Sequence, residues 1–472
     1  MRRSRANVSV VFAAAALLAG CALKSPPPPD EVRQEALGGM AVRDPWKAAA
    51  TSPAAVQDNW LATFEDPQLD ALAAEGVARN LDLRVAATRV EQAAGYVNLA
   101  KAALRPTVGI AGTGGIKLSD LSSALTGIIA LVSWELDLWG RLRYGEQAAQ
   151  ATYVATQADF EFARQSLAAT IARSWFTATE TWLQQQIAEE MVRAAQELAT
   201  LAADRRRVGV GNEQDVALAR ANLGTQQDNL RQARFAHEQS VRALELLLGR
   251  YPAAELKARL DLAKLPSAAP AGLPLEMLER RPDLIAAERR VAAAFNRVGE
   301  ARMARLPQIN LTGNIGYISS DILELKEDYE NPSAGVGGKL RAPIYTGGAL
   351  DTQVEIRTAE QKEAVAQYAR TALRAIGDVE NALAAAQALA ERETLLQQVV
   401  ADNRLALTLT QSAYRVGKLD LRSVQQQQLS VHAARIVLLR VQSEQLTQRV
   451  NLHLRWGAAS KWAALRRRGE PL

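Results

Sequence analysis

Few side chains of this 472-residue chain have the types and spacing that chemistry requires. No nucleophile–base pair or metal-ligand spacing is visible, and His237, His432 and His453 are isolated in the sequence. Gly335–Lys339 resembles part of a phosphate-binding loop, but Leu340 replaces the hydroxyl residue that should follow the lysine. Five methionines, three histidines and one cysteine provide no ladder of soft ligands for copper or silver. The chain is therefore predicted not to be an enzyme and to hold no metal or other bound cofactor.

The single cysteine, Cys21, has a position that predicts covalent modification. It follows a basic start and an apolar run, Val8–Leu18, which is too short to cross a bilayer of about 30 Å as a permanent helix. The four residues Leu-Ala-Gly-Cys that end at Cys21 resemble a bacterial lipobox. The resemblance implies that residues 1–20 are a removed signal peptide and that Cys21 carries diacylglycerol and palmitate. Residues 21–58 would then be a lipid-anchored N-terminal extension, and Ala22 after the cysteine favours the outer membrane.

The charge of the chain argues against nucleic acid as a partner. The formal net charge of +5 includes three arginines of the predicted signal peptide, so the mature chain carries only about +2. Basic and acidic residues are interspersed along the predicted helices, which is typical of solvated faces.

The sequence contains an internal repeat, so its predicted helices and strands occur twice along the chain. Asp82–Pro106 matches Asp283–Pro307 at an offset of 201, and Arg207-Val208-Gly209 recurs as Arg415-Val416-Gly417 at an offset of 208. Such a duplication indicates two structurally equivalent halves. The predicted halves are residues 59–265 and 266–457, followed by a C-terminal tail at 458–472.

Each half combines strands with a very long helical hairpin. Apolar and polar residues alternate in the predicted strand regions, about 107–138 and 308–345, as in Ile309, Leu311 and Ile315. The helical hairpins are predicted at about 140–249 and 348–456, because proline is absent from Arg141–Arg207 and helix-forming residues dominate there. The strands suit either a membrane barrel or soluble hairpins. In a membrane, four strands cannot close a barrel, so several copies would have to share one.

Six motifs give the chain a family resemblance that covers about residues 55–457. They are Asn59–Leu69, Asn80–Leu83, Ser133–Leu142, Glu279–Leu284, Ala342–Gly348 and Tyr414–Gly417. Together they resemble the outer membrane factor (TolC-like) family of Gram-negative efflux pumps, in particular its NodT-like lipoprotein branch. The resemblance implies a mainly α fold with membrane β: long helical hairpins forming a trimeric α-barrel tunnel, and four strands per chain forming a shared 12-stranded outer-membrane β-barrel.

The same resemblance implies a function. The chain would be a passive homotrimeric duct, lipid-anchored and inserted in outer-membrane lipid, with a tunnel in the periplasm. It would export small toxic compounds delivered by an inner-membrane RND-type pump through a periplasmic adaptor, the membrane fusion protein. A duct for type I protein secretion is the alternative, and a lipid-anchored coiled coil without a pore is a third reading.

The site residues lie at the two hairpin tips. Glycines there supply the positive φ or close backbone approach that a tight helix reversal needs, and the resemblance implies that the tips contact the adaptor.

The resemblance also places a gate near the tips, with a hydrogen bond between Asp215 and Tyr414 in the closed state. Relatives often carry aspartates at positions matching Ser423 and Gln426; here Arg422, Gln425, Gln426 and Gln427 are expected to line the first turns, which predicts weak block by divalent cations. The predicted adaptor-contact residues are Val208, Gly209, Gly211, Val416 and Gly417, and the predicted gate residues are Asp215, Tyr414, Arg422, Ser423 and Gln426.

Overall fold

The computed structural model describes residues 23–38, 46, 59–115, 126–266, 277, 279–320 and 331–457. The predicted signal peptide, the predicted modification site Cys21 and the predicted C-terminal tail lie outside these residues. The chain divides into two compact units, one built around Thr88–Ala158 and Ile285–Thr371 and the other around Asp159–Leu284 and Ala372–Leu472. Each unit is considered by itself.

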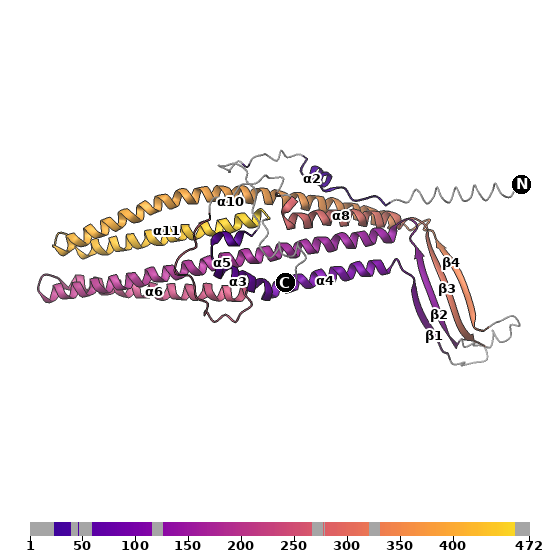
Figure 1. Cartoon of the computed structure of the whole chain (residues 1–472), viewed down its shortest axis with the longest axis horizontal. Helices are drawn as coiled ribbons and strands as arrows, with labels where there is room; N and C mark the ends of the chain where they lie inside the picture. The colour runs from indigo at the N-terminus through magenta and orange to yellow at the C-terminus, as the bar shows by residue number, and fades with distance from the viewer. Residues whose placement is uncertain are drawn as a thin grey trace. The chain divides into compact units, whose positions relative to one another are not determined.

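The first unit contains a four-stranded antiparallel sheet (Figure 1). Its strands are β1 (Thr107–Thr113), β2 (Thr126–Leu136), β3 (Gln308–Ser319) and β4 (Ser333–Arg341), in the order β1-β2-β3-β4. The sheet therefore joins two strands from each half of the chain. Leu138, which the alternation placed in a strand, lies beyond the end of β2, because the chain turns there through Gly140 at φ +81° into the next helix.

The helices repeat with equal lengths in the two halves. α4 (Leu81–Ala102) and α8 (Pro282–Met303) have 22 residues each and lead into β1 and β3. α5 (Arg141–Arg207) and α10 (Ala349–Arg415) have 67 residues each, and α6 (Glu213–Leu247) and α11 (Leu421–Arg455) have 35 each. The offset is 201 before the sheet and 208 after it, so the lengths differ only across the strands. The predicted internal repeat is confirmed.

The N-terminal segment packs on the first unit through a short helix. α2 (Pro29–Leu37) begins with a proline, which suits the first helical turn because the missing N–H has no intrahelical partner there. Val32 and Leu37 of α2 are buried. Upstream of α2, the backbone N–H of Lys24 donates to the Tyr144 hydroxyl of α5 at 2.9 Å.

The second unit has a core where an N-terminal segment meets the hairpins. η1 (Trp60–Phe64) and α3 (Pro67–Arg79) bury their apolar residues against α5, α6 and α11. Asp66 caps α3 by accepting from the N–H groups of Gln68 and Leu69, and it also accepts from Trp175 Nε1 at 2.8 Å. Its carboxylate pairs with Arg259 at 3.2 Å, so one buried side chain joins three segments.

His453 belongs to this core as well. Its imidazole stacks on Trp60, with ring centroids 5.7 Å apart and planes 14° apart. Burial lowers its pKa to about 4. This neutral, stacked histidine has a structural role in the core.

Within the described residues, no helix combines the length and apolarity needed to cross a bilayer. No group of three or more histidine, cysteine, aspartate or glutamate side chains in the same part of the chain is arranged to hold a metal ion.

Candidate functional site

The two hairpin tips have the same backbone geometry. Gly209 and Gly417 have φ +79° and +78°, the left-handed conformation that glycine adopts without steric cost. After each glycine the next N–H bonds back to the helix: Val210 to the Arg205 carbonyl at 3.0 Å, and Lys418 to the Ala413 carbonyl at 2.9 Å. This is the Schellman ending of a helix. The positive φ predicted for both tips is therefore confirmed.

Gly211 serves the first tip by close approach. A Cβ at this position would lie 2.8 Å from the Arg206 nitrogen, so only glycine fits. The second helix of each hairpin then begins with a polar cap: Asn212 accepts from the Asp215 N–H at 2.7 Å, and Asp420 accepts from the Ser423 N–H at 2.9 Å. Such caps satisfy backbone donors that have no intrahelical partner.

Apolar side chains remain exposed at the tips. Val208 is 67% exposed and Val416 is 70% exposed in this single copy of the chain. Both valines flank the turn glycines of their hairpins, where a partner helix could cover them.

A shared apolar cluster packs the two tips together. The tips are the turns between α5 and α6 and between α10 and α11 in Figure 1. Tyr414 is buried in this cluster, and the guanidinium of Arg205 lies over its ring, 4.9 Å from the centroid. Arg205 Nη1 also donates to the Tyr414 backbone carbonyl at 3.3 Å. The cluster comprises Leu198, Ala199, Ala202, Val216, Ala219, Tyr414, Leu421 and Val424.

The expected hydrogen bond between Tyr414 and Asp215 is absent from the protomer. The buried Tyr414 hydroxyl has no hydrogen-bond partner among the described residues. Burial raises the pKa of this phenol; the nearby Arg205 lowers it, and the Asp215 charge raises it further. Within one copy of the chain Asp215 lies within electrostatic range of Tyr414, and Arg205 makes the contacts between the tips; a bond between neighbouring hairpins of different copies stays a prediction. One sequence signal could have identified Arg205. The equivalent position in the second half, at the offset of 208, is Ala413, so the arginine occurs in one half and not in the other.

The predicted gate residues on α11 divide into two groups. Arg422 and Gln426 are exposed and four residues apart, so they share one face of the helix. Ser423 is half-buried, and its hydroxyl donates to the Asp420 carboxylate at 2.6 Å as part of the helix cap.

Of the glutamines expected to line the first turns, one is buried and one is hydrogen-bonded within the protomer. Gln425 is buried, and the side chain of Gln427 donates to the Asn403 backbone carbonyl at 3.1 Å. The side chain of Gln427 thereby points toward α10 of its own hairpin, and the lining expected for the gate in the trimer stays a prediction.

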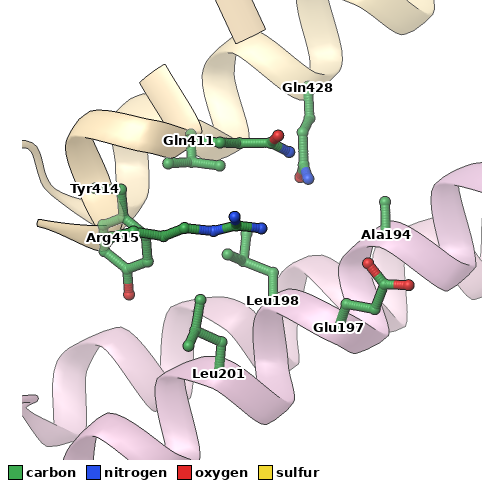
Figure 2. A pocket seen from close by; sticks show the side chains of 9 residues that line it. Ala194, Glu197, Leu198, Leu201, Gln411, Tyr414, Arg415 and Gln428 are labelled. Atoms are coloured by element: carbon green, nitrogen blue, oxygen red, sulfur yellow. The ribbon is translucent and has the colours of Figure 1, made fainter. Parts of the chain in front are cut away.

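A pocket lies between α5 and the second hairpin close to the tips (Figure 2). The side chain of Arg415 extends across it, with Tyr414 on one side and Gln428 on the other. Leu198 and Glu197 of α5 form the opposite wall. Arg415 forms no ion pair with any described residue.

The sheet has one apolar face and one polar face. Residues opposite each other in the register share a face, and successive residues alternate. On one face Val108 lies opposite Val132, and Trp134 lies opposite Leu311. The apolar face carries Val108, Ile110, Ile128, Val132, Trp134, Leu311, Ile315, Tyr317, Val336 and Leu340, all of them exposed. The other face carries Thr107, Ser133, Glu135, Asn310, Thr312, Asn314, Lys339 and Arg341.

The junction from β2 to α5 explains a motif that the sequence left without a role. Glu135 pairs with Arg141 through both carboxylate oxygens, and Asp137 accepts from the N–H groups of Leu142 and Arg143. The indole of Trp139 donates to the Pro307 carbonyl at 2.7 Å, which joins the two halves. These contacts fix the angle between strand and helix.

Comparison with known proteins agrees with this architecture. The family model of outer membrane efflux proteins matches residues 72–250 and 273–458. The probable efflux pump outer membrane protein TtgC of Pseudomonas putida strain KT2440 is 29% identical over 416 residues, which cover 85% of each chain. The cation efflux system protein CusC of Escherichia coli K12 is 28% identical over 461 residues, covering 94% of this chain and 98% of CusC.

A solved structure shows the same fold over nearly the full length. The open state of the Neisseria gonorrhoeae MtrE outer membrane channel superposes with a TM-score of 0.78 at 25% identity, covering 93% of this chain and 97% of MtrE. The sheet, the paired hairpins and these matches together show that this chain belongs to the outer membrane efflux protein family, the outer-membrane channels of efflux systems.

Proposed function

We propose that three copies of this chain form a passive duct through the outer membrane and the adjoining periplasm, exporting small toxic compounds that an inner-membrane pump delivers. The observation that carries the proposal is the sheet, whose exposed apolar face and two open edges are joined to two equal helical hairpins.

The open edges require additional copies in a membrane. β1 and β4 each pair with only one neighbour within the described part of the chain. An unpaired strand edge in lipid costs several kcal/mol per backbone group, so the edges must meet other strands. Three copies, with β1 of one pairing with β4 of the next, close a barrel of twelve strands. The apolar face then contacts lipid, and the polar face with Lys339 and Arg341 lines water.

The hairpins continue the duct as a helical tunnel. A helix of 67 residues extends about 100 Å at 1.5 Å per residue. The tips, with their exposed Val208 and Val416, are the contact surface for a periplasmic adaptor, through which an RND-type pump supplies the substrate. The relatives TtgC and CusC, an efflux pump protein and a cation efflux protein by name, support this kind of partner.

In this system the protein provides the path for the exported compound, and the pump provides the energy. Gly335–Lys339, which resembles part of a phosphate loop, lies within β4 and pairs with β3, so its backbone is used in the sheet. Cys21 is the proposed site of lipid attachment, which would hold the N-terminal segment at the membrane.

The gate is proposed to lie at the tips. Arg422 and Gln426, which share an exposed face of α11, would form rings around the tunnel in the trimer. These rings hold no carboxylates that could bind a divalent cation.

The experiment that tests the function is complementation in a Gram-negative strain that lacks its own efflux channels. The chain would be expressed with candidate adaptor–pump pairs, and resistance to small toxic compounds and the secreted proteins would both be measured. Restored resistance together with channels in planar bilayers supports the proposal. A changed set of secreted proteins without resistance would indicate a protein secretion duct, and purified protein that forms no channel would refute a duct of any kind.

A further inference from the structure

The two tips have the same backbone but different charges. The first tip, residues 204–215, carries three arginines and three acidic residues, whereas the second tip, residues 412–423, carries three basic residues and one acidic residue. At the offset of 208, Ser412, Leu421 and Ser423 replace Asp204, Glu213 and Asp215. The second tip therefore has a net charge of +2, while the first is neutral.

The two tips also differ in their ion pairs. In the first tip Arg207 pairs with Asp204 at 3.0 Å, and Arg206 pairs with Glu213. The basic residues of the second tip are Arg415, Lys418 and Arg422, and none forms an ion pair with another residue that the structure describes. All three are exposed. Its one acidic residue, Asp420, is occupied in capping α11 through Ser423.

Helix stability does not account for this charge. Acidic residues in the first turn of a helix are favourable because they face its positive end. α6 has Glu213 and Asp215 there, while the first turn of α11 has no acidic residue and carries Arg422. Asp420 caps α11, but the charge of Arg422 is unfavourable at this end of the helix, and on an exposed tip such a charge is expected where a partner surface uses it.

We propose that the second tip is a docking surface for an acidic segment of the partner protein, whereas the first tip is not selective for charge. The partner segment would carry carboxylates opposite Arg415 and Lys418. It would also carry an apolar residue to cover Val416 and Leu419, which are 70% and 42% exposed. In a trimer the three second tips present a repeated basic surface. This inference rests on the proposed function, since it takes the partner to be the helical hairpin of the adaptor.

The repeat supplies matched variants for the test. S412D places an acidic residue where the first tip has Asp204, so it should neutralise Arg415; both S412D and S412N remove the hydrogen bond from the Ser412 hydroxyl to the Thr408 carbonyl, so that loss is matched in the control. S412N has nearly the same shape and no charge, and it serves as the control. D204S makes the reverse change in the first tip and should free Arg207.

The probe is the adaptor that supports efflux with this channel in the complementation assay. Its affinity for the purified channel would be measured at low and high salt. S412D and R415E should each weaken binding, R415E on the order of tenfold at low salt, and salt should reduce the difference because exposed charges are screened. S412N should bind as the unmodified chain does, and D204S should bind as tightly or more tightly. Changing an acidic residue of the adaptor loop to lysine should restore binding to R415E.

The outcomes separate this inference from the proposed function. If the unmodified channel forms pores and binds the adaptor, but S412D and R415E bind equally well, the acidic partner segment is refuted and the duct stands. If the unmodified chain binds no adaptor, the proposed function itself fails. Equal loss with S412D and S412N would show that shape, and not charge, controls the contact, and would also overturn the inference.

Discussion

Replacing Arg205 by alanine should loosen the two hairpin tips, whereas removing the Tyr414 hydroxyl should not. Arg205 makes two contacts across the tips, one with the Tyr414 ring and one with its backbone carbonyl. A half-exposed cation–π contact contributes about 0.5–1 kcal/mol, and a long hydrogen bond from a charged donor about 1 kcal/mol. Their sum of about 1.5–2 kcal/mol corresponds to a shift of roughly tenfold to thirtyfold in the equilibrium between packed and separated tips.

The variant Y414F keeps both contacts, because it retains the ring and the carbonyl. It removes only a buried hydroxyl that has no partner, a change expected to be neutral or slightly stabilising. Under the proposed function, single-channel recordings in planar bilayers should show a higher open fraction for R205A and an unchanged one for Y414F. R206A, which breaks a contact within the first tip only, is the control.

The opposite pattern would refute this reasoning. If Y414F opened the channel as much as R205A, the hydroxyl would have to donate to a partner in the assembled trimer. The contact between Tyr414 and Asp215 would then be formed between copies, and D215A should produce the same opening as Y414F.

Three further predictions concern the rest of the chain. G417A should destabilise the tip by about 1 kcal/mol, since φ is +78° there, while G377A in open space on α10 should stabilise by about 0.5–1 kcal/mol in thermal unfolding. Because burial holds the pKa of His453 at about 4 against an ordinary value of 6.5, the unfolded chain binds the proton first, so stability should fall between pH 6.5 and pH 4; H453F should lose part of that dependence. Millimolar magnesium should block conductance only weakly, and strong reversible block would contradict an amide and arginine gate at Gln426 and Arg422.

The fold could be predicted because its signals are periodic and repeated. The limits of α5 follow from the absence of proline before the glycine tip, and its end at Arg207 is fixed by the left-handed Gly209. The strands were harder to delimit. Leu138 continues the alternation of β2, but the chain has already left the sheet to let Asp137 cap α5. The alternation of apolar and polar residues indicates which face of the strand a residue lies on. It does not indicate where the strand ends because the next residues cap a helix.

The tip residues could be located from the sequence, but their contacts could not. Sequence matching located Tyr414 and Asp215 at the tips, yet the orientation of each side chain depends on which neighbour buries it. Arg205 takes the Tyr414 ring because a long side chain from the last turn of α5 reaches across to α10. Gln425 turns inward because residues four apart share a helix face, and Leu421 at the start of α11 is fully buried. Contacts of this kind depend on the packing of two hairpins and not on either one.

The two repeated units have helices of equal length but tips of unequal charge. These two properties are under different structural constraints. Two hairpins that end at the same level of a tunnel must have equal lengths, and the offset of 208 is kept through all 67 and 35 residues of their helices. The change of seven residues lies mainly in the first strand of each half, since β1 has 7 residues and β3 has 12, and in the segment between the second strand and the long helix. Charge at the tips is free of both constraints, since exposed side chains there affect neither length nor register. The difference in charge at such positions, with Asp204 in one half and Ser412 in the other, is the difference expected of two tips that meet different surfaces.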